Sequence, residues 1–369
     1  MSNSITIEQL LEMVVEKNAS DLHLHVGRPP VLRVDGRLRT LNTPDLTPDD
    51  TRRMMEVVTT EEQRNDLENA GGTDFGFAFG EKARFRVAIY KEKGRVGVTL
   101  RLIPSKLMSF EQIGLPESVK NLCMRPRGLI LITGPTGCGK TTTLATMIDF
   151  INTEIDRHIV TVEDPIEYFH NHKKSIITQR EIGVDVPGFA EGIRRGLRQD
   201  PDVFLVGEMR DLETIGAAIT AAETGHLVFA TLHTTGAART VDRIIDAFPT
   251  NQQEQIRTQL SVSLISVISQ VLMPRAEGHG RVAGFEIMVT TDAIANQIRE
   301  NKTYHIPSAI QTGKQYGMIL LDDHLHQLFK QKAITYNEAM AKAQNPADLQ
   351  VKIKEGIEGA QKLQQKKKK

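Results

Sequence analysis

Residues 134–141 read GPTGCGKT and directly follow the apolar run GLILIT. They match the spacing G-x-x-x-x-G-K-[ST], in which glycines let backbone N–H groups turn inward around a phosphate. The helical segment that begins near Lys140 adds the positive end of its dipole. Lys140 is expected to reach the β- and γ-phosphates, and Thr141 to bind Mg²⁺. A strand before the loop and a helix after it argue against an incidental glycine-rich turn.

This loop predicts ATP and Mg²⁺ as cofactors. The residues expected to contact the nucleotide run along the loop and into the helix: Gly134, Pro135, Thr136, Gly137, Cys138, Gly139, Lys140, Thr141 and Thr142.

Three later apolar runs each lead into a reactive side chain. HIVTV (158–162) ends at Glu163, DVFLVG (202–207) at Glu208, and HLVFATL (226–232) at His233. In open parallel sheets, ligands lie at the carboxyl ends of the strands. If these strands run parallel to GLILIT, all three side chains point toward the γ-phosphate. One polar residue at a strand end is common, but three in succession indicate a nucleoside triphosphatase.

Phosphoryl transfer depends on positioning and charge neutralisation. One carboxylate must orient or deprotonate water, another must hold Mg²⁺ directly or through water, and His233 is suited to sensing the γ-phosphate. The residues beside the loop include no arginine. The candidates for a positive charge are Arg84 and Arg86, on one face of a strand, and Arg194 and Arg198, expected on a helical turn. For each of these arginines, the alternative to a catalytic role is an ordinary position on the solvent-exposed surface.

Two domains joined by a linker are expected to position these residues. Residues 1–103 predict an α+β domain: a helix over 7–17 capped by Thr6, helical structure over 47–67, and alternating segments typical of an antiparallel sheet. Asp35-Gly36 predicts a hairpin between two of those segments. Residues 104–116, with two prolines, are interpreted as the linker.

Residues 117–369 are expected to form an α/β ATPase domain, because strand-like runs alternate with helical segments. Beyond Asp242 the chain is predicted to be mainly helical. The run LSVSLISVISQVLM (260–273) is interpreted as a buried helix, since it is too short and polar to span a bilayer.

Composition narrows the class of protein. The 369 residues are 40% hydrophobic and 25% charged, which excludes disordered and fibrous chains. Basic and acidic residues number 46 each, so no nucleic-acid partner is expected. Two cysteines, Cys123 and Cys138, cannot form a four-cysteine zinc site. With no apolar run of about 20 residues, we expect a cytoplasmic protein with no transmembrane segment, able to lie against a membrane.

Several motifs in order resemble those of type IV pilus retraction ATPases, within the secretion ATPase superfamily. They are SDLHLHVGRPPVLRVDGRL, GPTGCGKTTTLA, VEDPIEY, DPDVFLVGEMRDLET, GHLVFATLHT and TTDAIANQIRENKTYHIPSAIQTGKQYGM. The likeness covers nearly the whole chain. It implies a RecA-like P-loop ATPase core, a small N-terminal PAS-like α+β domain and a helical C-terminal region.

The resemblance also implies a function and roles for residues. The expected protein is a homo-hexameric motor that hydrolyses ATP to retract type IV pili for twitching motility. It would work at the cytoplasmic face of the bacterial inner membrane, on a pilus platform protein there. Glu163 would activate water, Glu208 would act on Mg²⁺ through water, and His233 would link nucleotide state to domain position. Arg84 and Arg86 would lie near the nucleotide.

Other functions stay open at this stage. A related motor for pilus extension, protein secretion or DNA transfer would use the same phosphate chemistry, although extension and secretion ATPases commonly carry a four-cysteine zinc element. An accessory ring that binds ATP but barely turns over, and a helicase, are further alternatives. Two positions depart from expectation: Ala295 replaces an arginine usual in the C-terminal motif of the family, and Gly207 precedes Glu208 where many P-loop enzymes have Asp.

Overall fold

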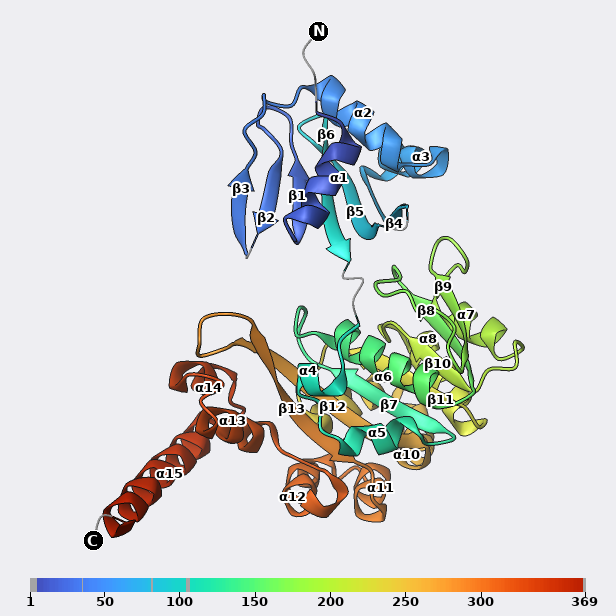
Figure 1. Ribbon diagram of the computed structural model, residues 1–369. Coiled ribbons are helices and arrows are strands. Elements are labelled where there is room, and N and C mark those ends of the chain that lie inside the picture. The colour runs from blue at the N-terminus through green and yellow to red at the C-terminus, as the bar shows by residue number, and fades with distance from the viewer. Residues whose placement is uncertain (1–4, 35, 81, 104–106, 368–369) are drawn as a thin grey trace. The chain divides into compact units, whose positions relative to one another are not determined.

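The computed structural model describes residues 5–34, 36–80, 82–103 and 107–367, with only the backbone for 357–367. The chain divides into two compact units, residues 1–106 with 165–169 and residues 107–164 with 170–369 (Figure 1). The assignment of 165–169 to the first unit has no counterpart in the sequence prediction, which placed a single boundary.

The linker prediction needs correction. Residues 104–106 lie outside the described residues, whereas 107–116 belong to the second unit. There α4 (Phe110–Ile113) buries Phe110, and Leu115 after it is also buried. The helix is only one turn long, so it leaves no periodic pattern in the sequence.

The first unit is an antiparallel sheet in the order β3-β2-β1-β6-β5-β4, with helices packed against its apolar face (Figure 1). Its strands are β1 (Asp21–Leu24), β2 (Val31–Val34), β3 (Arg37–Thr40), β4 (Gly72–Phe79), β5 (Ala83–Glu92) and β6 (Arg95–Ile103). Its helices are α1 (Ile7–Glu16), α2 (Pro48–Val58) and α3 (Glu61–Ala70).

Local sequence explains these elements. Each helix begins after a threonine whose side chain accepts a hydrogen bond from the third helical residue, and Thr6 is the N-cap of α1, as predicted. The predicted hairpin is confirmed in its register, since Val34 pairs with Arg37; Asp35 itself lies outside the described residues. On β5, Phe85 and Val87 are buried, which leaves Arg84 and Arg86 on the opposite face.

The second unit is built on a seven-stranded sheet in the order β13-β12-β7-β11-β10-β8-β9. All neighbouring strands are parallel except β12 and β13, which confirms the α/β prediction. The strands are β7 (Gly128–Thr133), β8 (His158–Glu163), β9 (Ile176–Glu181), β10 (Val203–Val206), β11 (Leu227–Leu232), β12 (Leu264–Pro274) and β13 (Arg281–Val289).

Helices cover both faces of this sheet, so its central strands are apolar on both sides. On β7, Leu129 and Leu131 pack into one core cluster, whereas Ile130 and Ile132 pack into the other. The helices are α5 (Ser118–Cys123), α6 (Lys140–Glu154), α7 (Phe189–Gly196), α8 (Leu212–Glu223), α9 (Ala237–Asp246) and α10 (Thr250–Ser263), besides α4. The helix α6 lies on the face of Ile130 and Ile132, and α8 and α9 lie on the other.

The prediction of a buried helix over 260–273 is wrong. The helix α10 ends at Ser263, and Leu264–Pro274 forms β12, parallel to β7. A short apolar run buried on both faces has no periodicity that separates strand from helix. The run is rich in Val and Ile, which favour a pleated surface, and pairing with β7 on one side and β13 on the other decides for the strand.

The prediction of a mainly helical chain beyond Asp242 holds only in part, because β12 and β13 interrupt the helices. The chain after β13 is helical. It contains α11 (Asp292–Arg299), α12 (Ile306–Thr312), α13 (Leu321–Lys330), α14 (Tyr336–Lys342) and α15 (Pro346–Lys367), with single 3-10 turns at Thr303–His305 and Lys314–Tyr316. Leu325, Leu328 and Leu349 from α13 and α15 share a small core with Val271 and Met273 of β12. Of the helices in the described residues, none combines the length and apolar character needed to cross a bilayer.

Candidate nucleotide site

The loop between β7 and α6 depends on glycine at defined positions. Gly134, Gly137 and Gly139 have φ of 138°, 79° and 92°, a region that favours glycine. A Cβ at Gly134 would lie 2.2 Å from the carbonyl oxygen of Gln270 and 2.8 Å from Cys138 Sγ. The loop therefore packs directly on β12, with its exposed surface at Pro135, Thr136 and Gly137.

Gln270 of β12 supports this loop from beneath. Its side chain is buried, donates from Nε2 to the Cys138 carbonyl oxygen at 2.6 Å, and accepts from Thr143 Oγ1 at 2.9 Å. One amide thus binds both the loop and the first turn of α6. The Cys138 side chain is buried as well, and burial raises the pKa of its thiol, so we expect this residue to act through its backbone.

Lys140 and Thr141 open α6, the helix whose N-terminal N–H groups lack intrahelical partners. Its N-cap, Gly139, has no side chain that could cap them. Lys140 Nζ donates to the carbonyl oxygen of Gly134 at 2.8 Å, across the mouth of the loop. Loop, lysine and helix N-terminus together form a cradle of donors suited to phosphate oxygens.

Glu208 and His233 meet beside this cradle. The Glu208 carboxylate accepts from Arg210 Nε and Nη2, both at 2.7 Å, and lies 3.0 Å from His233 Nε2. His233 Nδ1 lies 3.4 Å from Thr136 Oγ1. His233 therefore bridges the phosphate loop and the glutamate, as the parallel strands predict.

The charge of Glu208 follows from these neighbours. Partial burial raises its pKa, but the hydrogen bond from Arg210 and the charges of His233, Arg210 and Lys140 outweigh burial and lower the pKa below its usual value. Glu208 is therefore ionised at neutral pH. Arg210, two residues after Glu208, was not predicted from the sequence.

Glu163 is the last residue of β8 and is only 8% exposed. Its Oε1 accepts from Thr161 Oγ1 at 2.7 Å and from Gln179 Nε2 at 3.1 Å. Strand β8 is the parallel neighbour of β10, and Gly207 N–H donates to Val162 O. Glu163 and Glu208 therefore leave adjacent strands at the same edge of the sheet.

Packing explains the glycine that precedes Glu208. A Cβ at Gly207 would lie 3.3 Å from the Val162 carbonyl oxygen and 3.4 Å from Glu163 Cα. A side chain at this position would meet the end of β8 at close range, which favours glycine before Glu208.

The structure does not bring the predicted arginines of this unit to the site. Arg198 is exposed and lies in the turn that follows α7, where its N–H donates to the Arg195 carbonyl oxygen at 3.1 Å. The residues that follow it approach His158, the first residue of β8, through the contact between Asp200 O and His158 Nδ1. Arg198 thus lies toward the amino ends of the strands, away from Glu208 of its own chain. Arg194 pairs with Glu191 and Glu213.

The two arginines of the first unit, Arg84 and Arg86, lie on one face of β5. Arg86 pairs in register with Arg101 of β6, and Arg84 with Ile103. Both side chains are half-buried within that unit.

Two glutamines that support the site, Gln270 and Gln179, were not predicted from the sequence. Gln270 was hidden because its segment was interpreted as a helix, and Gln179 lies on β9, a strand without a strong pattern. Glutamine by itself does not indicate a catalytic or binding role, and the hydrogen-bond partners of Gln270 and Gln179 are 132 and 16 positions away in the chain. Only the pairing of strands reveals them.

Comparison with known proteins agrees with this geometry. A family model described as type II/IV secretion system protein matches residues 3–367. The chain is 48% identical to the type IV pilus retractation ATPase PilT of Pseudomonas aeruginosa over 92% of its own length and 98% of that protein. It belongs to the type II/IV secretion system protein family. The predicted family resemblance is confirmed.

Two further similarities support the assignment. The chain is 47% identical to a twitching motility protein of Neisseria gonorrhoeae over 86% of this chain and 84% of that one. A crystal structure of the pilus retraction motor PilT with bound ADP has a TM-score of 0.88 and 46% identity, covering 94% of this chain and 99% of that chain. The protein is therefore a nucleotide-binding ATPase with the fold of these motors.

Proposed function

We propose that this protein hydrolyses ATP to drive retraction of type IV pili by pilin depolymerisation, and so supports twitching motility. It would act as a homo-hexamer at the cytoplasmic face of the inner membrane, on a platform protein of the pilus machine. The observation that carries this proposal is the 48% identity to a retraction ATPase over 92% of this chain and 98% of that protein. The convergence of the phosphate loop, Glu208 and His233 supports it chemically.

In the proposed reaction, water attacks the γ-phosphorus of ATP and the bond to the β–γ bridging oxygen breaks. Glu163 would orient this water and accept its proton, which then passes to the phosphate product. Lys140 would neutralise charge on the β- and γ-phosphates, and His233 would report the presence of the γ-phosphate through Thr136. The hydrogen bonds to Glu163 Oε1 support the role of a base, because they hold the carboxylate in one orientation.

The donor set suits Mg²⁺, which prefers oxygen ligands and retains several waters. Bound Mg²⁺ would neutralise charge on the phosphates. The hydroxyl of Thr141, at the second position of α6, would be its direct protein ligand. Both oxygens of Glu208 accept hydrogen bonds from Arg210, so we propose that Glu208 acts on the ion through water.

A positive charge from another part of the assembly is also part of the proposal. Arg84 and Arg86 of the first unit are the candidates implied by the family resemblance. Arg198 would serve only the site of a neighbouring subunit, since in its own chain it lies toward the other edge of the sheet. An arginine supplied in this way accelerates phosphoryl transfer by about 10³–10⁵-fold in other enzymes.

The number of surface pili per cell tests the function. We would compare a deletion of the gene with a Glu208→Ala replacement, and use Glu277→Ala, an exposed carboxylate of the β12–β13 turn, as the matched control. Excess pili and lost surface motility in the first two strains, with a normal count in the control, are expected. Bald cells would instead indicate a pilus extension motor.

Two other outcomes would redirect the proposal. Excess pili in the deletion with normal numbers in Glu208→Ala would indicate an accessory ring whose presence matters more than its turnover. Unchanged numbers in both strains would indicate secretion or DNA transfer.

A further inference from the structure

Gln179 contacts the proposed general base from the neighbouring strand. It lies on β9, opposite Thr161 of the parallel strand β8, and its Nε2 donates to Glu163 Oε1 at 3.1 Å. Thr161 Oγ1 donates to the same oxygen at 2.7 Å. Two donors on one carboxylate oxygen restrict rotation of the carboxylate, and thereby fix the direction in which its other oxygen points.

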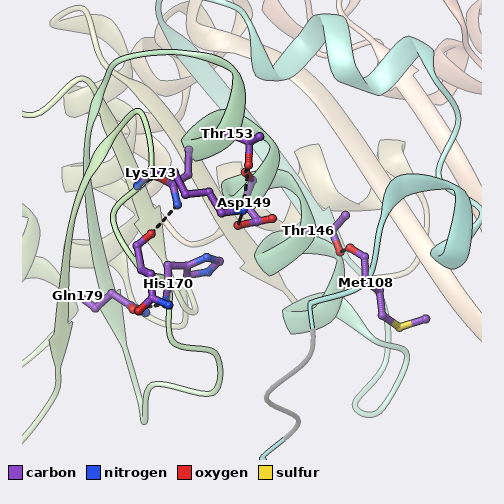
Figure 2. Close-up of polar contacts among 9 residues, drawn as sticks. Met108, Thr146, Asp149, Thr153, His170, Lys173 and Gln179 are labelled. Carbon is purple, nitrogen blue, oxygen red and sulfur yellow. Dashed lines mark hydrogen bonds and ion pairs between the residues drawn. The ribbon is translucent and has the colours of Figure 1, made fainter.

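The orientation of the Gln179 amide is itself determined. Its Oε1 accepts from the backbone N–H of His170 at 2.9 Å (Figure 2). If the amide were turned by 180°, its NH₂ group would face that N–H and its oxygen would face the Glu163 carboxylate. Both contacts would be repulsive, so the amide can only donate to Glu163.

The segment that holds this amide is fastened to the phosphate-loop helix. Lys173 Nζ contacts Asp149 and Thr153 of α6 at 2.6 and 2.9 Å, as Figure 2 shows. Asn152 of α6 donates to the backbone oxygen of Asn171 at 2.8 Å and accepts from the Lys173 N–H at 3.0 Å. The backbone of His170 is thus fixed close to α6, the helix that begins at Lys140.

We propose that Gln179 is a positioning residue for Glu163, which orients the carboxylate toward the attacking water and relates its position to α6 through the 170–174 segment. This inference rests on the proposed role of Glu163 as the base. Because Gln179 donates to Glu163 Oε1 and accepts from the His170 backbone, its loss should affect the chemical step more than nucleotide binding.

The first test is steady-state ATP hydrolysis by the full chain with Mg²⁺. Gln179→Met keeps the length of the side chain and removes both the donor to Glu163 and the acceptor of the His170 N–H. We expect kcat to fall about 10- to 100-fold, the range for a misplaced catalytic group, while KM for ATP stays within about twofold. Gln259→Met is the matched control, because it breaks a Gln–Glu hydrogen bond of 2.8 Å on the surface, and it should behave as the wild type.

A pH profile separates positioning from a structural role. Gln179→Glu still accepts from His170 but places a second carboxylate beside Glu163, and two adjacent carboxylates tend to share one proton. Its kcat should be lowest at about pH 8 and should recover relative to wild type as the pH falls, because the shared proton restores a donor. A profile parallel to that of the wild type would overturn the proposal, and so would an unchanged kcat in Gln179→Met.

The failure of the base assignment is distinguishable. Glu163→Gln should lose most activity, and adding Gln179→Met to it should cause little further loss, since the two residues act as a unit. If Glu163→Gln stays active, the role of Glu163 and this inference both fail. If Glu163→Gln is inactive and Gln179→Met is normal, only this inference fails. Should Gln179→Met not fold, Thr161→Val removes the other donor and is expected to lower kcat in the same way.

Discussion

The contact between Gln270 and the phosphate loop leads to a quantitative prediction. The side chain is 1% exposed and bonds both the Cys138 carbonyl and the Thr143 hydroxyl. Gln270→Met preserves the volume but leaves two buried polar groups without these partners. Each such group costs about 1–3 kcal/mol. The Thr143 hydroxyl can rotate toward the carbonyl of the preceding helical turn, so we expect a loss of about 2–4 kcal/mol in the free energy of unfolding.

Thermal and chemical unfolding measure this loss. For a unit of this size, about 2–4 °C of Tm corresponds to each kcal/mol, so Tm should fall by roughly 5–15 °C. KM for ATP should rise as well, because the loop that binds the phosphates loses its support. Gln199→Met, at an exposed turn, is the control and should leave both quantities unchanged.

A double-mutant cycle shows where the reasoning would fail. Thr143→Val removes the other side-chain partner, and replacing both members of a buried pair by apolar groups is less costly than removing one. The double variant Gln270→Met with Thr143→Val should therefore be more stable than the sum of the single losses, by about 0.5–3 kcal/mol. Strict additivity, or a Tm of Gln270→Met within about 2 °C of wild type, would refute the role of the buried amide.

Three further predictions concern the same unit. Gly134→Ala should prevent stable folding, because its Cβ would lie 2.2 Å from a backbone oxygen, whereas Gly137→Ala, with open space around it, should cost only about 1–2 kcal/mol; solubility and Tm compare them. Burial raises the pKa of the Glu286 carboxyl above its usual 4.5, so the stability contributed by this group should be lost as the pH rises from that value. In urea unfolding, the stability of Glu286→Gln relative to wild type should therefore improve over the same range, and parallel curves would contradict this. Arg210→Ala should raise the pKa of Glu208 and, since Arg210 is largely exposed, lower stability by at most about 1 kcal/mol; a salt-independent loss in unfolding titrations would argue against an ion pair.

Much of the candidate site could be predicted because its signals are local. The loop 134–141 requires glycine, lysine and threonine at fixed spacing, and each reactive side chain directly follows an apolar run. Parallel strands end at one edge of a sheet, so Glu163, Glu208 and His233 could be assigned to that edge before any coordinates. The strand register and the contacts of Glu208 with His233 bear out this reasoning.

The predictions of secondary structure were wrong where the local sequence pattern does not distinguish a helix from a strand or a loop. The run 264–274 is apolar on both sides, so neither period appears in the sequence, and its neighbours β7 and β13 decide for a strand. Residues 107–116 lack periodicity because α4 has only four residues, yet Phe110 and Leu115 are buried in the second unit.

By itself, the sequence determined the phosphate loop, the α/β alternation and the order of the reactive residues, because these depend on neighbours in the chain. Only the tertiary structure decided which polar side chains support them. Gln270 reaches Cys138 across 132 positions, and Gln179 reaches Glu163 from the adjacent strand. A buried amide becomes informative only when its hydrogen-bond partners are known, because burial makes those bonds obligatory, and the sequence does not state which groups are buried together.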